Sequence, residues 1–249
     1  MARKLMHALQ YDSYGGGAAG LKHAEVPVPS AKKDEQYSVF AEHAFTHTRR
    51  ICFLAAKISI ATALDIAGEV VAVGPGVEDF KTGDKVVAVL GASSGGGLAE
   101  FAVAKKSLSV ARPPEVSAAE AAGLPIAGLT AYEALTKCAG VQLDGSGIQK
   151  NILITAASGG VGHYAVQLAK LGNTYVTATC GARNLEFVRD LGADEVLDYK
   201  TPEGAALKSP SGKKYDAVIH CAPGSPGIPW STFEPNLSEN GKVIRTYIS

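Results

Sequence analysis

One segment joins an apolar run, a glycine-rich turn and an amphipathic run, and it restricts the possible folds more than any other part of the chain. Residues 151–156 read NILITA, and residues 157–162 read ASGGVG. A glycine-rich turn between a buried strand and a helix exposes backbone N–H groups at the positive end of the helix dipole, where a pyrophosphate can bind. The segment therefore predicts the strand–turn–helix unit of a dinucleotide-binding domain.

The run after the turn has the spacing of a helix that lies on a sheet. Val161, Ala165, Leu168 and Ala169 share one face, while polar side chains occupy the other. The sequence LGN at 171–173 is a stop signal. A β-branched strand is expected next, over residues 174–180. Among the glycine clusters of the chain, this one has strand, turn, helix and strand in order.

The end of that second strand indicates which nucleotide is bound. Gly181 stands about 20 residues past the last glycine of the turn, where an NAD-selective site carries an acidic residue for the ribose hydroxyls. A glycine there removes the repulsion of a 2′-phosphate. Arg183 supplies a guanidinium whose fork suits phosphate, so we expect NADPH. The alternative is an Arg183 that is solvated on the first turn of a helix.

Two other glycine clusters lack this context. Residues 15–17 follow a strand-like run over 4–11 but lead into VPVP at 26–29, which cannot open a helix. Residues 95–97 precede a second strand-like run at 98–103, so a turn is expected there.

Composition excludes several classes of protein. The chain has 249 residues, 46% of them hydrophobic, which is enough for a sizeable core. Lys and Arg number 24 and Asp and Glu number 24, and basic residues come only in pairs, which disfavours nucleic acid as a partner. The four cysteines have no C-x-x-C spacing, and no run of 18 apolar residues occurs. We expect thiols in a reducing compartment and no spanning helix.

The chain separates into two regions. Residues 1–125 hold short strands and turns, with strands expected at 65–74, 85–90 and 98–103. From residue 126 onward, strands alternate with helices, which predicts an α/β fold with a doubly wound parallel sheet. The strands of that sheet are expected at 151–156, 174–180, 194–198, 215–221 and 242–248.

Four stretches resemble the medium-chain dehydrogenase/reductases, and within them the zinc-independent quinone oxidoreductase branch. The stretches are 8–29, 65–74 with 83–86, 128–135 and 151–244. The resemblance implies a GroES-like β domain over 1–125, on the substrate side, and a Rossmann domain over 126–249. It also implies NADPH as cofactor, with hydride delivered to quinones or to the carbon–carbon double bond of α,β-unsaturated carbonyls.

The resemblance also carries site residues, by position. Ala156, Gly159 and Gly162 look like the pyrophosphate turn, with backbone from Ser158, Gly160 and Val161. Arg183 and Tyr199 look like the grip on the 2′-phosphate, and Thr130 looks like a nicotinamide-side contact. Cys221 and Ala222 end the strand from residue 215, where the crevice of a doubly wound sheet lies.

Each of these assignments has a simpler alternative. Tyr199 could cover a sheet edge, Thr130 could begin a helix, and a small residue after residue 220 is ordinary packing. No catalytic residue is identified. A Tyr with Lys four residues later, as short-chain dehydrogenases require, does not occur among the nine tyrosines. We therefore expect the substrate's own conjugation to activate it, with the proton coming from water or an unassigned acid.

Metal ligands are not expected. Zinc-dependent relatives carry Gly-His-Glu where this chain reads LDI at 64–66, and a four-cysteine lobe does not occur. His43 and His47 would form a metal pair only if their segment were helical, and a third ligand does not accompany them.

Two departures from the family are expected to matter. Residues 36–63 do not resemble its substrate-pocket segment, and residues 245–249 fall inside what should be the fifth Rossmann strand of a longer, six-stranded sheet. The chain thus reads as truncated. The alternative function is an impaired form that only binds NADPH or associates with full-length subunits. A homodimer is also possible by resemblance.

The resemblance, which is strongest to plant members of the branch, finally implies a cellular location. It implies the chloroplast, with peripheral association at the envelope and no cleavable transit peptide. The cytoplasm is the alternative.

Overall fold

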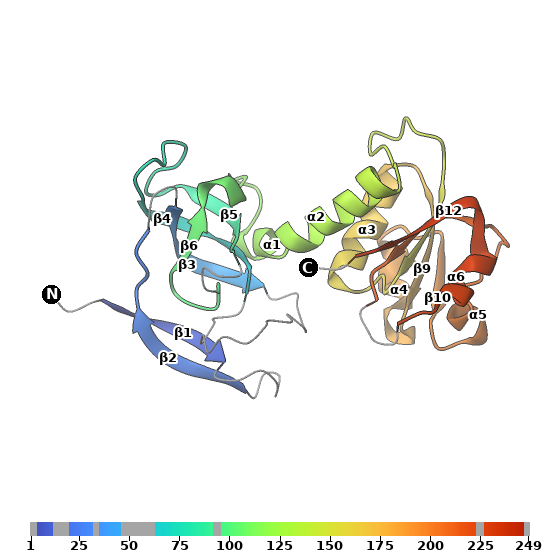
Figure 1. Ribbon diagram of the computed structural model, residues 1–249, viewed down its shortest axis with the longest axis horizontal. Helices are drawn as coiled ribbons and strands as arrows, with labels where there is room; N and C mark the ends of the chain where they lie inside the picture. The colour runs from blue at the N-terminus through green and yellow to red at the C-terminus, as the bar shows by residue number, and fades with distance from the viewer. Residues whose placement is uncertain are drawn as a thin grey trace. The chain divides into compact units, whose positions relative to one another are not determined.

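The computed structural model describes residues 4–11, 20–31, 35–45, 63–91, 96–222 and 227–246. For residues 35–45 it describes the backbone alone. The chain divides into two compact units, Met1–Ile126 and Ala127–Ser249. Figure 1 labels elements of each unit where there is room. The glycine cluster at 15–17 lies outside the described residues, as does much of the segment 36–63.

The first unit contains two antiparallel sheets. The smaller is a hairpin of β1 (Leu5–Tyr11) and β2 (Leu21–Pro27). The larger has the strand order β6-β3-β4-β5-β7, and every pair in it is antiparallel. Its strands are β3 Glu35–Phe45, β4 Asp65–Val73, β5 Lys85–Val89, β6 Ala102–Lys105 and β7 Ser109–Ala111, with the short helix η2 at Lys106–Leu108.

The strands predicted near 65–74 and 85–90 are confirmed, but the strand predicted at 98–103 is wrong at its start. The strand β6 begins only at Ala102, and within 98–101 Ala99 forms an isolated bridge to Ala8. The backbone of Leu9 donates to Leu98 O at 2.8 Å, and that of Glu100 donates to His7 O at 3.1 Å. Residues 98–100 are therefore an addition to the hairpin instead of the first half of a sheet strand.

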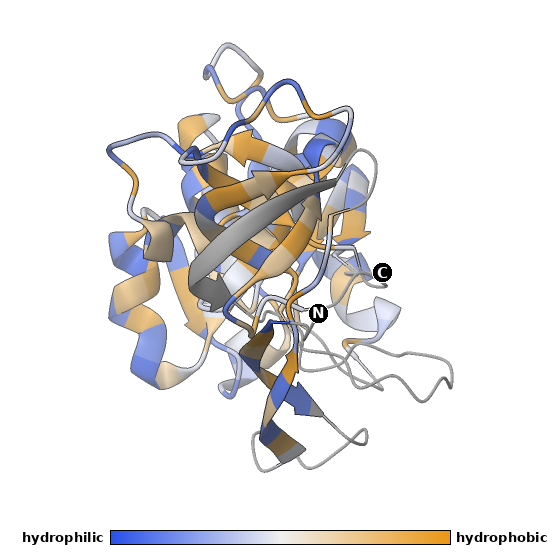
Figure 2. Ribbon diagram, turned by 90° about the vertical axis from the view of Figure 1, so that its left-hand side faces the viewer, coloured by the Kyte–Doolittle hydropathy of each residue, from blue (hydrophilic) through white to orange (hydrophobic). Residues whose placement is uncertain are grey.

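Alternation along β4 gives the larger sheet two apolar faces. Ile66 joins one buried cluster, with Ala88 and Leu90 among its members. Ala67 joins another, on the opposite face, where helix α1 (Ala118–Ala122) packs. Figure 2 shows apolar residues along the strands of this unit. Both faces are thus covered, as the mostly apolar sequence of β4 requires.

The first residue of β4 is a buried carboxylate. Asp65 is 1% exposed, and its two oxygens accept from the backbone nitrogen of Ile126 at 3.1 and 3.3 Å. Burial raises the pKa of this carboxyl to about 7, and the hydrogen bond from Ile126 opposes the rise. Asp65 therefore links the start of β4 to the end of the same unit.

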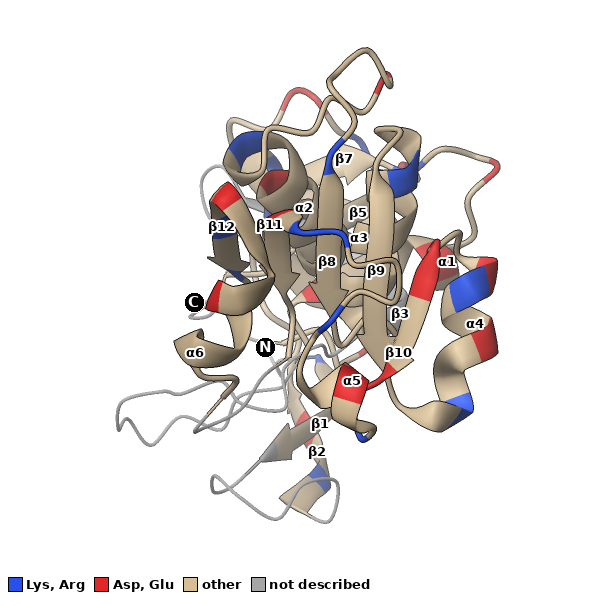
Figure 3. Ribbon diagram, turned by 90° about the vertical axis from the view of Figure 1, so that its right-hand side faces the viewer, with Lys and Arg blue, Asp and Glu red and all other residues tan. Residues whose placement is uncertain are grey.

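The second unit is a five-stranded parallel sheet with the order β10-β9-β8-β11-β12. Figure 3 shows these strands side by side. Their bounds are β8 Asn151–Thr155, β9 Tyr175–Cys180, β10 Glu195–Asp198, β11 Tyr215–His220 and β12 Leu237–Arg245. The predicted doubly wound α/β fold is confirmed. The last strand, however, begins five residues before the predicted 242 and ends at Arg245.

Helices connect and cover these strands. The helix α2 (Pro125–Glu133) begins in the last two residues of the first unit and leads into a π-helical turn, η3 (Ala134–Cys138). The remaining helices are α3 Gly160–Leu171, η4 Ala182–Asn184, α4 Leu185–Asp190, α5 Pro202–Ala205, α6 Trp230–Phe233 and η5 Glu234–Asn236. Within the described part of the chain, no helix is long and apolar enough to cross a bilayer.

The main core of this unit lies where α3 packs on the sheet. Ala165, Val166 and Ala169 of α3 are fully buried, together with Ile152 and Ile154 of β8. The predicted apolar face is confirmed except at Leu168, which is only partly buried at the edge of the cluster. The stop signal is confirmed as well, because Gly172 caps the helix and donates to Leu168 O at 3.1 Å. This packing aims the start of α3 at the carboxyl ends of the strands.

Candidate nucleotide-binding site

The turn between β8 and α3 is shaped for close approach of a ligand. Ala156 has a φ of +50°, and its carbonyl accepts from the backbone nitrogen of Gly159 at 2.9 Å. Gly159 is the N-cap of α3 and has no capping side chain. The N–H groups of the first turn of a helix have no partner inside the helix. They are thus available, with the positive end of the dipole, for an anion.

The turn has no space for a side chain at Gly162 and little space for one at Gly159. A Cβ atom on Gly162 would lie 2.7 Å from Ala157 Cα, which is closer than real Cβ contacts allow. A Cβ atom on Gly159 would lie 3.1 Å from Ala156 O, which is tight. Gly162 is therefore required by the packing of α3 against its own turn, as a dinucleotide-binding turn demands.

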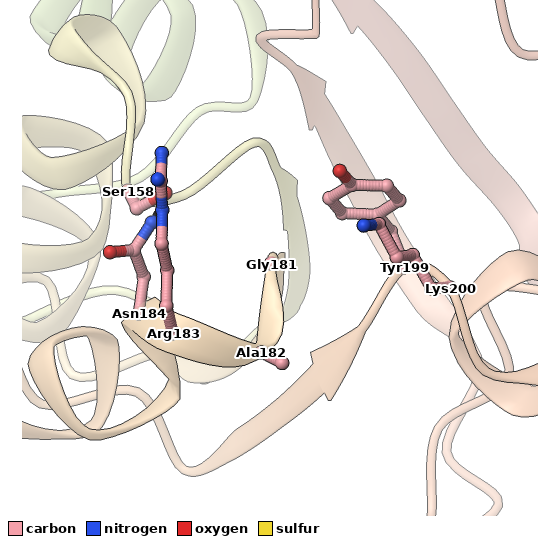
Figure 4. Close-up of a pocket in the computed structure, with 7 residues that line it drawn as sticks. All are labelled: Ser158, Gly181, Ala182, Arg183, Asn184, Tyr199 and Lys200. Carbon is pink, nitrogen blue, oxygen red and sulfur yellow. Dashed lines mark hydrogen bonds between the residues drawn. The ribbon is translucent and has the colours of Figure 1, made fainter.

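A cavity of about 600 Å³ opens beside this turn. Figure 4 shows its lining side chains, with Arg183 and Asn184 extending next to Ser158, and Tyr199 and Lys200 on another side of the opening. The lining residues are Ser158, Gly181, Ala182, Arg183, Asn184, Tyr199 and Lys200. The cavity thus collects the ends of three neighbouring strands, β8, β9 and β10.

Four of the residues singled out from the sequence meet in this cavity: Ser158, Gly181, Arg183 and Tyr199. Sequence reasoning missed Ala182, Asn184 and Lys200, which also line it. Each of the three is adjacent in sequence to a residue that was found. The signal that could have found them is the rule that all positions following a strand end meet at the same edge of a parallel sheet.

The charge of the cavity is cationic. Arg183 and Lys200 are its two ionisable cations, and none of its seven lining residues is acidic. The ammonium of Lys200 lies 5.9 Å from the centre of the Tyr199 ring, which is within the range of a cation–π contact. Tyr199 is half exposed, so its ring faces solvent at this opening instead of only covering the sheet edge. The site can attract a phosphate group.

Two hydrogen bonds fix the walls of the cavity. The amide of Asn184 donates to Ser158 Oγ at 3.1 Å, and the backbone of Asn184 donates to Gly181 O at 2.8 Å. A Cβ atom on Gly181 would lie 3.5 Å from the Tyr199 ring, an ordinary contact. A larger residue would therefore fit sterically at position 181, after the end of β9.

A second polar group of residues lies at the carboxyl ends of β8 and β11. The backbone nitrogen of Cys221 donates to Thr155 Oγ1 at 3.1 Å, and Thr155 Oγ1 lies 2.8 Å from Nδ1 of His220. Burial raises the pKa of the Cys221 thiol to about 11, so this thiol is protonated at neutral pH. Ala222 follows and is partly buried. Thr155 and His220 were not found from the sequence, although each is a polar residue at the end of an apolar strand.

The remaining predicted residues lie elsewhere. Gly160 and Val161 form the first turn of α3. Thr130 is partly exposed in the interior of α2, five residues past its start, so the interpretation as a helix-initiating residue is wrong. It is not among the residues that line the cavity. Its contact with a nicotinamide stays a prediction.

The helical segment that a metal pair of His43 and His47 would have required is not present at His43. His43 lies in the strand β3, and His47 lies outside the described residues. Among the residues that the structure describes, no three His, Cys, Asp or Glu side chains are grouped so that they could hold a metal ion.

Comparison with known proteins gives two family matches. Residues 39–114 match the alcohol dehydrogenase GroES-like domain, and residues 160–227 match the zinc-binding dehydrogenase domain. The first match includes residues 39–63, most of the segment that we expected to depart from the family.

The chain is also similar to individual oxidoreductases over most of its length. The chain is 66% identical over 254 residues to the chloroplast envelope quinone oxidoreductase homolog of Arabidopsis thaliana, covering 98% of this chain and 75% of that one. It is 33% identical to the chloroplastic NADPH-dependent alkenal/one oxidoreductase of the same plant, covering 88% and 58%. Among solved structures, the quinone oxidoreductase from Coxiella burnetii has a TM-score of 0.81 at 28% identity, covering 97% of this chain and 75% of that one.

Proposed function

We propose, from the premise that this chain belongs to the medium-chain dehydrogenase/reductase family, that it binds NADPH and reduces quinones or α,β-unsaturated carbonyls. The chain is an oxidoreductase by that membership. The choice of NADPH over NADH rests on the cavity at the ends of β8, β9 and β10. The choice of substrate rests on the names of the relatives.

The observation that carries the cofactor proposal is the charge of that cavity. Arg183 and Lys200 line it, whereas Gly181 occupies the position at which an acidic residue would accept from the ribose hydroxyls of NADH. A 2′-phosphate would receive a forked guanidinium and an ammonium there, without a carboxylate among the lining residues to repel it. Tyr199 offers a phenol and a ring face at the same opening.

The turn before α3 supplies the second half of the cofactor site. The first N–H groups of α3 are free of partners inside the helix, and Gly162 allows the backbone to pack closely. A pyrophosphate held there would leave its adenosine half toward the cavity and its nicotinamide half toward Cys221 and Ala222. Bound NADPH supplies a hydride, and the residues of this chain hold and orient the donor.

The proton that follows the hydride is proposed to come from water. A conjugated carbonyl or a quinone accepts hydride without a metal, because the charge is delocalised onto its own oxygen. Cys221 is a poor acid at neutral pH, since burial raises the pKa of its thiol to about 11. Water is therefore the simplest proton source for the reduced product.

The location and the assembly are further proposals. Three relatives at 64–66% identity carry chloroplast or chloroplastic in their names, so we place this chain in the chloroplast, with peripheral contact to the envelope. A homodimer is the proposed assembly. Gel filtration of the purified chain and fractionation of isolated chloroplasts test these two points.

The cofactor proposal is tested by titrating the purified chain with NADPH and with NADH, followed by a panel of quinones and enones in the same cuvette. We expect selective NADPH binding and substrate-dependent loss of absorbance at the nicotinamide band. Replacing Arg183 removes a charged hydrogen bond worth about 1.5–3 kcal/mol, so R183A should weaken NADPH binding by roughly 10- to 100-fold and leave NADH unchanged.

A matched control separates the site from general charge. R189A removes an arginine of α4 that does not line the cavity, and it should bind NADPH as the parent chain does. Equal affinity of the parent chain for NADPH and NADH would overturn the choice of cofactor. Binding without turnover on any quinone or enone would overturn the proposed reaction and leave a nucleotide-binding protein.

A further inference from the structure

We propose that Thr155 and His220 act as a positioning pair, which orients the backbone at Cys221 and thereby the nicotinamide half of the bound nucleotide. This inference rests on the proposed function, because it concerns the same cofactor. It assigns a role to two residues that neither form the adenosine-side cavity nor belong to the glycine-rich turn.

The location of the pair is the first argument. In the order β10-β9-β8-β11-β12, successive strands are added on one side of β8 and then on the other, so the topology reverses between β8 and β11. Ligands of doubly wound sheets bind in the crevice outside the carboxyl ends of the strands at this reversal. Thr155 is the last residue of β8, and His220 is the last residue of β11. The pair therefore spans the place where the crevice opens.

The hydrogen-bond pattern is the second argument. The hydroxyl of Thr155 accepts from the Cys221 backbone nitrogen at 3.1 Å, and its oxygen lies 2.8 Å from Nδ1 of His220. A threonine hydroxyl has one proton to donate. Donation of that proton to Nδ1 gives a complete chain from Cys221 N–H through Thr155 to His220. This series of hydrogen bonds fixes the direction in which the backbone leaves β11.

The surroundings of His220 favour the neutral ring that this pattern needs. The side chain is buried, 6% exposed, and its ring meets that of Phe233 edge-on with centres 5.3 Å apart. Burial lowers the pKa of His220, and the nearby positive charge of Arg245 lowers it further. A neutral imidazole with its proton on Nε2 keeps Nδ1 free to accept from Thr155.

The backbone of His220 is held from a third strand. Thr246 follows β12, and its backbone nitrogen and hydroxyl donate to His220 O at 3.2 and 3.3 Å. His220 is thus fixed by Thr155 through its ring and by Thr246 through its carbonyl. An acceptor held on both sides can keep the Thr155 hydroxyl in one orientation, which is what positioning a reactive group requires.

The test separates the two halves of the nucleotide. The probe for the adenosine half is 2′,5′-ADP, which carries the 2′-phosphate but has no nicotinamide. The probe for the other half is the fluorescence of the reduced nicotinamide of bound NADPH. We expect T155V to bind 2′,5′-ADP within about two-fold of the parent chain, yet to lose about ten-fold of the NADPH affinity and the bound-state fluorescence.

Conservative variants distinguish positioning from folding. T155S keeps the hydroxyl and should restore the fluorescence, whereas H220F keeps a ring but removes the acceptor and should resemble T155V. H220N keeps an acceptor, so its NADPH affinity and bound-state fluorescence should be close to those of the parent chain. Because the two residues act as one unit, the T155V/H220F double variant should lose no more than either single variant.

Two outcomes would overturn the inference. One is parent-like NADPH affinity and fluorescence in both T155V and H220F. The other is an equal loss of 2′,5′-ADP and NADPH affinity together with a lowered unfolding midpoint, since that pattern indicates a purely structural pair. Neither readout depends on turnover. If the parent chain binds NADPH but reduces no quinone or enone, the proposed reaction is refuted. The positioning pair is then still tested by the binding and fluorescence measurements.

Discussion

The amide nitrogen of Asn184 donates to Ser158 Oγ at 3.1 Å and so joins the turn after β8 to the turn after β9. The two residues are 26 positions apart in sequence but lie on the same wall of the cavity. Ser158 belongs to the glycine-rich turn that we propose holds the pyrophosphate, and Asn184 follows Arg183 directly. The bond therefore couples the two places at which the nucleotide is expected to be held.

Breaking this bond should weaken the grip on the nucleotide. N184A removes the donor, and a lost neutral hydrogen bond of about 1 kcal/mol predicts an affinity for NADPH lowered by roughly five-fold. S158A should give a loss of similar size. Calorimetric titration checks both, and a double variant whose loss equals the full sum of the two single losses would show that the pair is not coupled.

An acidic residue at the end of β9 should shift the preference toward NADH. Gly181 has an ordinary φ of −82°, and a Cβ atom there meets only the Tyr199 ring at 3.5 Å, so aspartate fits without backbone strain. G181D should lower NADPH affinity by ten-fold or more, at about 1.4 kcal/mol of repulsion per factor of ten, and should not lower NADH affinity. G181A is the control for steric effects. Unchanged selectivity in G181D would place the 2′-phosphate elsewhere.

Side chains in the glycine-rich turn should have graded effects. G162A places its Cβ 2.7 Å from Ala157 Cα, so the turn or the helix must move, whereas the contact of G159A at 3.1 Å is milder. We expect G162A to abolish NADPH binding and to lower the free energy of unfolding by about 1–3 kcal/mol, as overpacking does. G159A should lose less of both. Denaturant unfolding and nucleotide titration of both variants measure these losses. A larger loss in G159A than in G162A would contradict the described geometry of the turn.

The stability of the first unit should depend on pH through Asp65. The folded pKa of this carboxyl is raised to about 7 from 3.8, so the folded state binds more protons than the unfolded state between these values. Stability is therefore lost as pH rises from about 4 to about 7. D65N keeps an oxygen that can accept from Ile126 and avoids the buried charge.

We accordingly expect D65N to be more stable than the parent chain at pH 8, by about 1–3 kcal/mol, and close to it at pH 4.5. Urea unfolding at the two pH values measures this. S117A, which removes the cap of α1, serves as a control because its loss should be present at both. A D65N variant less stable at pH 8 would mean that the carboxylate charge contributes favourably.

The parts of the fold that could be predicted are those in which local pattern and final packing agree. In the helix from Gly160 to Leu171, apolar residues recur every three to four positions, and a glycine caps its end. The strand β12 begins earlier than the sequence predicts, because its residues 238–242 have no apolar side chain and its register to β11 shifts between Tyr215 and Ala217. A polar run inside a strand gives no apolar periodicity from which the sequence could predict it.

In the candidate site too, some residues could be predicted from local sequence and others only from the final packing. The glycine-rich turn and Arg183 follow from sequence because their residue types are unusual in their context. Lys200 and Asn184 are ordinary surface residue types, and they become visible only when three strand ends are brought to one edge. The roles predicted for Thr130, Arg183 and Tyr199 stay predictions until nucleotide binding is measured.

The polar contacts at His220 also bear on how the second unit folds. Thr155 lies 65 positions from His220, and Thr246 lies 26 positions from it, so the contacts close only after β8, β11 and β12 have paired. Contacts between distant residues carry a loop-closure cost and form late. The Cys221 amide should therefore exchange its hydrogen whenever this part of the sheet opens, which makes it a natural reporter of the final step in assembling the crevice.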